Sequence, residues 1–263
     1  MQSQQPFEKC LHFISSEAGH VPQPPSSGPR AEHLLTITIS RQAGSGAHRV
    51  AQHLADYLQD RAPQSPHPWA VFDHNLVEQV LEDHHLPVRL ARHMPEDRVP
   101  DLADAVDELL GIHPPAWTLV QQTAETILRL ARRGNAILIG RGAHVVTSQV
   151  PHVFHVRLVG SIEKRIEHIR EIRGMDRKQA LAVIRREDRG RQRYLKRYFG
   201  KDLEDPLSYH LTVNTDTLPY EEAARLIGDA ARARLNGGNN FTALRPEPDP
   251  LRLWSPSVAG AKV

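Results

Sequence analysis

The stretch Ile37–Arg49, which reads ITISRQAGSGAHR, decides the fold of this chain. The β-branched run Leu35–Ile39 predicts a strand, and apolar residues at helical spacing after the stretch predict a helix: Val50, Leu54, Tyr57 and Leu58. Gly44, Ser45 and Gly46 lie between the two, where glycines let backbone N–H groups approach phosphate oxygens at a helix N-terminus. A tight structural turn is the alternative for this tripeptide alone, and the strand–loop–helix context favours phosphate binding.

Strand and helix patterns alternate along the rest of the chain. Further strands are expected at 70–72, 136–139, 153–158 and 211–213. Helical patterns occupy 75–84, about 101–110, a longer stretch that ends at Gly134, the segment capped by Ser161, and a basic helical pair over about 176–200. A last helix opens at Pro219 and is expected to turn Leu226 and Ile227 inward. This order predicts a parallel sheet with helices on both faces and a ligand site at the carboxyl ends of the strands.

Length and composition suggest one folded domain with two tails. The chain has 263 residues, and 40% of them are apolar, which is enough for a substantial core. Proline-rich segments of little periodicity predict a disordered N-terminal arm over 1–33 and a flexible C-terminal tail over 236–263. The domain then covers 34–235, and both tails are expected to be dispensable for its stability.

Charge and cysteine content exclude several classes of protein. The formal net charge of +2 gives no global field toward nucleic acid or membrane. The single cysteine, Cys10, excludes an intramolecular disulfide and fits a reducing cytoplasm. No apolar run approaches the ~20 residues that a membrane span needs. The 16 histidines are scattered, which favours solvated surface over a metal site. We therefore expect a cytoplasmic protein with no membrane partner.

The glycine loop departs from the usual phosphate-binding pattern, which reads G-x-x-x-x-G-K-[ST]. Gly46 fits the second glycine of that pattern, whereas Arg41 stands at the first. Ala47 replaces the lysine, and His48 replaces the hydroxyl residue. Arg41 or Arg49 could supply the missing positive charge, and loss of catalysis is the competing explanation. A side chain at Gly46 is expected to block the path of the phosphates.

Five motifs in one order resemble the cytidylate kinase-like family. They are the opening ITISRQAGSG at 37–46, Phe72-Asp73, the segment IGRGA at 139–143, the arginine-rich EDRGRQR at 187–193, and the stretch from Asp205-Pro206 through Tyr209 to Asn214-Thr215. The resemblance implies an α/β fold of the three-layer P-loop NTPase type with about five parallel strands. It also implies a helical acceptor-binding insertion over about 74–115 and a basic lid over about 174–202.

The basic lid also has a physical meaning of its own. Arg185, Arg189, Arg193 and Arg197 are four residues apart and line one helical face. Arginine forks suit the oxygens of a transferring phosphoryl group. A solvated basic face or a nucleic-acid patch is the alternative. Nucleic acid is disfavoured because the rest of the chain must be net negative when the total is only +2.

The resemblance implies transfer of the γ-phosphoryl group of ATP·Mg²⁺ to a nucleoside monophosphate, and CMP or dCMP is the first candidate acceptor. Gly44, Ser45 and Gly46, continuing into Ala47 and His48, would bind the donor phosphates. Arg41 or Arg49 would replace the lysine, and Arg189, Arg191 and Arg193 would close over the transferring group, with Asp188 orienting an arginine. Arg141 would hold the acceptor phosphate, and Gly142 stands where cytidylate kinases have an aspartate. Asp73 would orient Mg²⁺-bound water or the acceptor, or else cap a helix.

Two other classes remain open at the level of sequence. A nucleotide-binding regulator without kinase activity is suggested by Ala47 and His48, and ATP turnover distinguishes it from an enzyme. A nucleic-acid-binding module built on the basic lid would show steep salt dependence of binding. Small-molecule nucleotides are the expected partners, and the sequence makes no prediction about oligomeric state.

Overall fold

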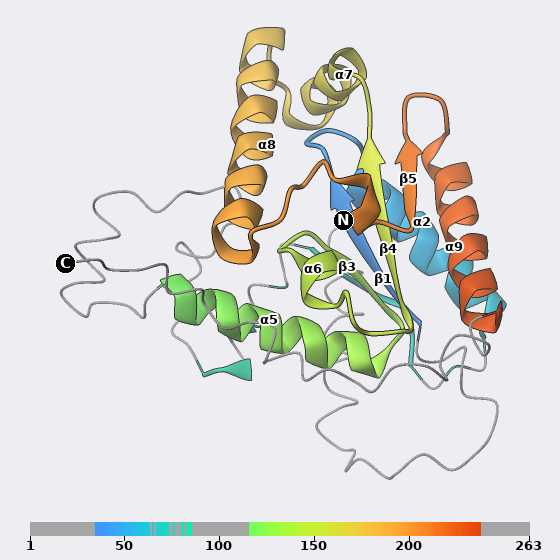
Figure 1. Ribbon diagram of the computed structural model, residues 1–263. Coiled ribbons are helices and arrows are strands. Elements are labelled where there is room, and N and C mark those ends of the chain that lie inside the picture. The colour runs from blue at the N-terminus through green and yellow to red at the C-terminus, as the bar shows by residue number, and fades with distance from the viewer. Residues whose placement is uncertain are drawn as a thin grey trace, which may run out of the picture.

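Five parallel strands form the central sheet (Figure 1). The computed structural model describes residues 35–85, without positions 64, 66, 74–75, 77–79 and 82, and residues 116–237. The strands are β1 (Thr36–Arg41), β2 (Ala70–Phe72), β3 (Ala136–Ile139), β4 (Val153–Val159) and β5 (Leu211–Asn214), and their spatial order is β2-β3-β1-β4-β5. The strand that carries the glycine loop therefore lies at the centre, and the fold class that the sequence predicts is confirmed.

Helices cover both faces of this sheet and one of its ends. One face packs against α2 (Ala47–Arg61) and α9 (Tyr220–Gly237), and the other against α5 (Ala116–Arg133) and the short α6 (Ala143–Val146). The remaining elements are α7 (Ile162–Arg173), α8 (Arg177–Phe199) and the 3-10 turn η3 (Pro206–Ser208). Figure 1 shows α7 and α8 beyond the carboxyl end of β4. Among the described helices, none is long and apolar enough to cross a membrane.

The alternation of side chains along β1 separates an apolar face from a polar one. Ile37 and Ile39 are buried in the same cluster as Leu54 of α2 and Ile227 of α9. Thr36, Thr38 and Ser40 point to the opposite face and are buried as well. Thr36 Oγ1 donates to the carbonyl of Ala131 on α5, 3.1 Å away. The central strand is thus apolar toward α2 and α9, and it offers hydroxyl groups to the other side.

Two expectations about helices were wrong. The basic stretch 176–200 forms the single helix α8 of 23 residues instead of a helical pair. Its N-terminus has a capping box between Asp176 and Gln179, and it ends at Gly200 in the left-handed conformation. On α9, Leu226 is 44% exposed, while Ala224 and Ala231 are buried beside Ile227. Small alanines let α9 approach α2 closely, so the larger leucine lies at the edge of the contact.

Some predictions fall outside the described residues. They include the N-terminal arm, the C-terminal tail beyond residue 237 and the helix at 101–110. The acceptor-binding insertion at 74–115 also lies there for the most part, although Leu76, Val80 and Leu81 are described and buried. The dispensability of the tails stays a prediction.

Candidate active site at the carboxyl end of the sheet

Residues 42–46 form the loop between β1 and α2, and we call them the glycine loop. Gly44 and Gly46 have φ of 82° and 78°, a left-handed conformation that glycine adopts without strain. The amide of Ser45 donates to the carbonyl of Gln42 at 3.2 Å. Ser45 is 2% exposed, and its hydroxyl has no hydrogen-bond partner among the described residues. The loop therefore holds a buried polar atom that a ligand could satisfy.

Both glycines of this loop lie so close to neighbouring helices that a Cβ would clash with them. A Cβ at Gly44 would lie 2.7 Å from the carbonyl oxygen of Arg165 on α7. A Cβ at Gly46 would overlap the ring of Tyr220 at the start of α9 and lie 2.7 Å from its phenol oxygen. The sequence suggested that a side chain at Gly46 would fill the phosphate path. In the structure its nearest obstacle is Tyr220, so the glycine is required by packing.

Asp188 of α8 reaches the glycine loop. Its Oδ1 accepts from the backbone N–H of Ala43 at 2.7 Å and from Nη2 of Arg191 at 2.7 Å. Its Oδ2 accepts from Nη1 of Arg165 at 2.6 Å, and the same Nη1 donates to the carbonyl of Ala43 at 3.2 Å. One carboxylate thus joins the loop, α7 and α8. Asp188 thus contacts two arginines, and its part in orienting one during catalysis stays a prediction.

The structure separates the lid arginines into two groups. Arg191 is 5% exposed and pairs with Glu187 and Asp188 on its own helix. Arg189 and Arg193 lie on the outer side of α8. With Ala182, Arg185 and Arg186 they line an open groove of about 330 Å³. Of the three arginines expected to close over phosphate, Arg191 is therefore committed to carboxylates, and the other two face the groove.

Arg41 and His48 meet at Asp73, which follows the last residue of β2. The carboxylate of Asp73 lies 4.0 Å from Nη2 of Arg41 and 3.7 Å from Nδ1 of His48. The neighbouring carboxylate of Asp73 raises the pKa of His48 above its ordinary value. The residues at the usual first-glycine and hydroxyl positions of the pattern, Arg41 and His48, therefore flank one carboxylate beside the glycine loop.

Arg49 and Arg141 occupy different parts of this end of the sheet. Arg49 points to α7, where its Nη2 lies 3.8 Å from Glu171, and both side chains are exposed. Arg141 follows β3 and has a left-handed φ of 56° between Gly140 and Gly142. A Cβ at Gly142 would lie 2.8 Å from the ring of Phe199 at the end of α8. The Gly-Arg-Gly turn is thus packed under the end of the lid helix.

A buried polar network at the end of β1 was missing from the sequence prediction. Arg157 of β4 is 3% exposed, and its Nη1 donates to Oγ of Ser40 at 3.0 Å. Tyr209 Oη lies 3.2 Å from Ser40 Oγ and 3.3 Å from Nε2 of His144. An arginine inside the mostly apolar strand at 153–158 is a sequence signal that could have indicated this network.

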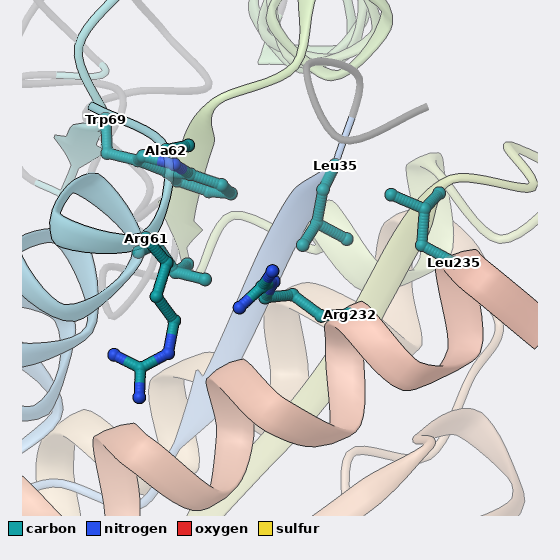
Figure 2. Close-up of a pocket in the computed structure, with 7 residues that line it drawn as sticks. Leu35, Arg61, Ala62, Trp69, Arg232 and Leu235 are labelled. Carbon is teal, nitrogen blue, oxygen red and sulfur yellow. The ribbon is translucent and has the colours of Figure 1, made fainter. Parts of the chain in front are cut away.

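A second hollow in the molecule lies away from these groups. Figure 2 shows it between the ends of α2 and α9, where Leu35, Trp69 and Arg232 line it. Its volume is about 20 Å³, which leaves room for about one water molecule. It adjoins the amino end of β1, at the opposite end of this strand from the glycine loop, so it does not belong to the candidate site.

The sheet order, the glycine loop on the central strand and the basic helix held against it define an α/β protein with the three-layer P-loop fold. The sequence matches the cytidylate kinase-like family over residues 36–217, and the chain belongs to this family. Family membership supports a nucleotide kinase type of function. No protein of curated function matches the sequence closely.

Solved structures with the same arrangement share little sequence with this chain. An uncharacterized protein from Eubacterium ventriosum is 19% identical with a TM-score of 0.54, and the match covers 76% of this chain and 99% of that one. A gluconokinase from Sinorhizobium meliloti is 16% identical with a TM-score of 0.47, over 80% of this chain and 98% of that one. A shikimate kinase from Acinetobacter baumannii is 15% identical with a TM-score of 0.43, and the match covers 77% of this chain and 95% of that one. The first of these supports the fold.

Proposed function

We propose that this protein transfers the γ-phosphoryl group of ATP to a nucleoside monophosphate, with CMP or dCMP as the first candidate. The observation that carries the proposal is the glycine loop on the central strand, with the Arg41–Asp73–His48 cluster beside it. Such a loop is suited to phosphate because it offers backbone N–H groups at the start of α2. Arg41 would supply the positive charge that the missing lysine would otherwise supply, and Asp73 would keep its guanidinium beside the loop.

The residues of the chain would act mainly by position and charge. Phosphoryl transfer requires alignment of donor and acceptor and neutralisation of charge on the phosphoryl oxygens. Gly44, Ser45 and Gly46 would bind donor phosphates, and the unpartnered hydroxyl of Ser45 gains a partner when they do. Arg41, fixed by Asp73, would direct its guanidinium toward them. Arg189 and Arg193 lie on the outer side of α8, so they would reach the phosphates only if α8 moved from the position in which Asp188 and Arg191 hold it to the loop.

The residues present fit Mg²⁺ bound mainly through phosphates and water. Among the described residues, no group of three histidine, cysteine or acidic side chains could form a protein cage for a metal ion. Mg²⁺ in such sites usually needs only one or two carboxylates besides phosphate and water. Asp188 is already bonded to the loop and to two arginines, so Asp73 is the carboxylate that would hold a Mg²⁺-bound water. The ion would neutralise charge on the donor phosphates.

The acceptor side of the proposal rests on Arg141. Its left-handed backbone places it at the carboxyl end of β3, one strand away from the glycine loop. A guanidinium there would bind the phosphate of a monophosphate acceptor. Gly142 offers no carboxylate for a sugar or base, so the identity of the base must be decided by residues elsewhere or by experiment.

A panel of acceptors tests the proposal directly. ADP release should be followed with ATP and Mg²⁺ and with CMP, dCMP, UMP, AMP or GMP as acceptor, and we expect CMP or dCMP to be turned over fastest. Removal of Mg²⁺ by a chelator should stop the reaction. ATP binding without transfer to any acceptor would overturn the proposal and favour a nucleotide-binding regulator, the function that Ala47 and His48 suggest.

Two matched arginine variants test the role of the loop cations. Arg41→Ala should reduce turnover by ~10²-fold, the usual effect of losing one electrostatic donor from a shielded site. Arg49→Ala should change turnover by less than about threefold, because an exposed ion pair with Glu171 contributes little. Equal turnover for Arg41→Ala and the wild type would show that Arg41 does not replace the lysine. Binding of ATP to each variant separates a loss of affinity from a loss of transfer.

A further inference from the structure

The starting point is a charged side chain inside the sheet. Arg157 lies beside Ser40 in the register of β1 and β4, and the guanidinium is almost fully buried. Its Nη1 donates to Ser40, and its Nη2 pairs with the carboxylate of Glu204. A buried arginine is stable only when its hydrogen bonds are made, so these two contacts determine where it points.

The direction of each hydrogen bond follows from what each group can donate. Tyr209 Oη lies 2.8 Å from the carbonyl oxygen of Leu203, which can only accept, so the single phenol hydrogen goes there. Ser40 accepts from Arg157 and therefore uses its own hydrogen for Tyr209. The phenol oxygen also lies 3.3 Å from Nε2 of His144, which donates to it when that nitrogen carries the ring proton.

These bonds form a closed circuit. It runs from Glu204 to Arg157, then to Ser40 and Tyr209, and returns to Leu203, the residue before Glu204. The ring of Tyr209 also lies against that of His144, with centroids 4.8 Å apart. One side of the circuit is the end of β1, and the other is the segment that leaves α8 on its way to β5.

The position of the circuit relative to the glycine loop gives it a consequence for function. Ser40 directly precedes Arg41, and Leu203 comes shortly after α8 ends at Phe199. A second tie, between the glycine loop and α8 itself, is the bond from Ala43 to Asp188. Arg41 therefore lies between two points at which the chain is held to α8 or to the segment after it.

On the basis of the proposed function, we propose that Tyr209 and Arg157 are positioning residues, which set the place of Arg41 and the glycine loop relative to α8 through Ser40. They need not touch the substrates. A displacement of about 1 Å in a catalytic group is enough to slow a reaction by ~10²-fold.

The test compares two phenol hydrogen bonds. Tyr209→Phe removes the hydroxyl from the circuit, and Tyr57→Phe removes a hydroxyl that donates to Asp229 at 2.6 Å on the opposite face of the sheet. We expect kcat to fall by at least about tenfold for Tyr209→Phe, with the KM values for both nucleotides within about threefold of the wild type. Tyr57→Phe should leave kcat unchanged. Ser40→Ala, a smaller change in the same circuit, should reproduce Tyr209→Phe and serves if that variant fails to fold.

Hydrogen exchange provides a readout that does not depend on activity. In Tyr209→Phe and Ser40→Ala, exchange should quicken together in residues 40–46 and 200–209, and in Tyr57→Phe it should quicken in neither segment. Unchanged exchange in 40–46 for both circuit variants would overturn the positioning role. If the wild-type protein transfers phosphate to no acceptor, the proposed function fails, and the exchange comparison still decides whether the circuit holds the loop.

Discussion

At the scale of single residues, Gly46 shows how a distant neighbour restricts one position. Its left-handed φ and the ring of Tyr220 both act against a side chain. The two effects are separable because Gly174, at the end of α7, has a φ of 63° and no atom within 4 Å of an added Cβ. Gly174 therefore carries the backbone penalty alone, and Gly46 carries the penalty together with the clash.

We expect Gly46→Ala to lower the free energy of unfolding by about 2–4 kcal/mol, of which about 1–2 kcal/mol is backbone strain and the rest is overpacking. Gly174→Ala should lose only about 1–2 kcal/mol. Urea unfolding measures both. In a double-mutant cycle, Tyr220→Ala should recover the overpacking part of the Gly46→Ala loss. If the losses at positions 46 and 174 are equal, the contact with Tyr220 has no energetic importance.

At the scale of elements, α8 is held to the rest of the domain by its inner face. Asp188 accepts from the glycine loop and from two arginines, and Glu187 pairs with Arg173 of α7 at 3.0 Å. The outer face carries the exposed arginines around the groove. The lid proposed from the sequence is therefore a helix with one anchored face and one basic face, and motion of its inner face would require breaking the Asp188 contacts.

Asp188→Asn should reduce the free energy of unfolding by about 3–5 kcal/mol, because it removes the counter-ion of two largely buried arginines. Arg165 and Arg191 are 9% and 5% exposed. The matched control is Asp60→Asn at an exposed position near the end of α2, where the same chemical change should have almost no effect. Thermal or urea unfolding measures both variants. A loss below about 1 kcal/mol for Asp188→Asn would mean that water or other groups replace the carboxylate.

At the scale of the whole molecule, the buried His155 and its stacked neighbour His210 make stability depend on pH. Burial, together with nearby His210 and His144, lowers the pKa of His155 to about 3, and burial lowers the pKa of His210 to about 4. Nδ1 of His210 accepts from the backbone N–H of His155 at 2.8 Å, so protonation there would break the bond. Their rings are stacked with centroids 4.9 Å apart, and two imidazolium ions in that arrangement would repel each other.

The direction of the pH effect follows from the depressed pKa values. A histidine in the unfolded chain titrates near pH 6.5. Below that pH, His155 and His210 therefore bind protons in the unfolded chain but not in the folded one. Stability is therefore full above about pH 6.5 and falls as the pH approaches 4 and then 3. For His155 the loss at pH 5 is about 2 kcal/mol. Urea unfolding at pH 7, 6 and 5 checks this. The slope of the unfolding free energy against pH should flatten in His155→Gln and stay unchanged in His53→Gln. Equal slopes in the wild type and both variants would contradict the assignment.

Local patterns in the sequence were sufficient for the fold. The strand runs, the helix caps at Ser161 and Gly134 and the Gly-Ser-Gly turn each depend on neighbours a few residues away. The five strands and the glycine loop were therefore predictable. The exception is α8, where a helical pair was expected and the fold has one continuous helix with Gly190 buried inside it.

The tertiary structure decided which charged groups meet. From the sequence, Arg41 and Arg49 were equal candidates for the missing lysine, and the fold turns the first to Asp73 and the second to Glu171. From the sequence, Arg191 and Arg189 were equally able to bind phosphate, but in the fold Arg191 is buried and pairs with Asp188. Ser40, Arg157 and Tyr209 carried no common pattern at all. Contacts of this kind join residues that are far apart in the chain. Which residues meet depends on how the strands and helices pack, and periodicity and propensity do not encode that packing.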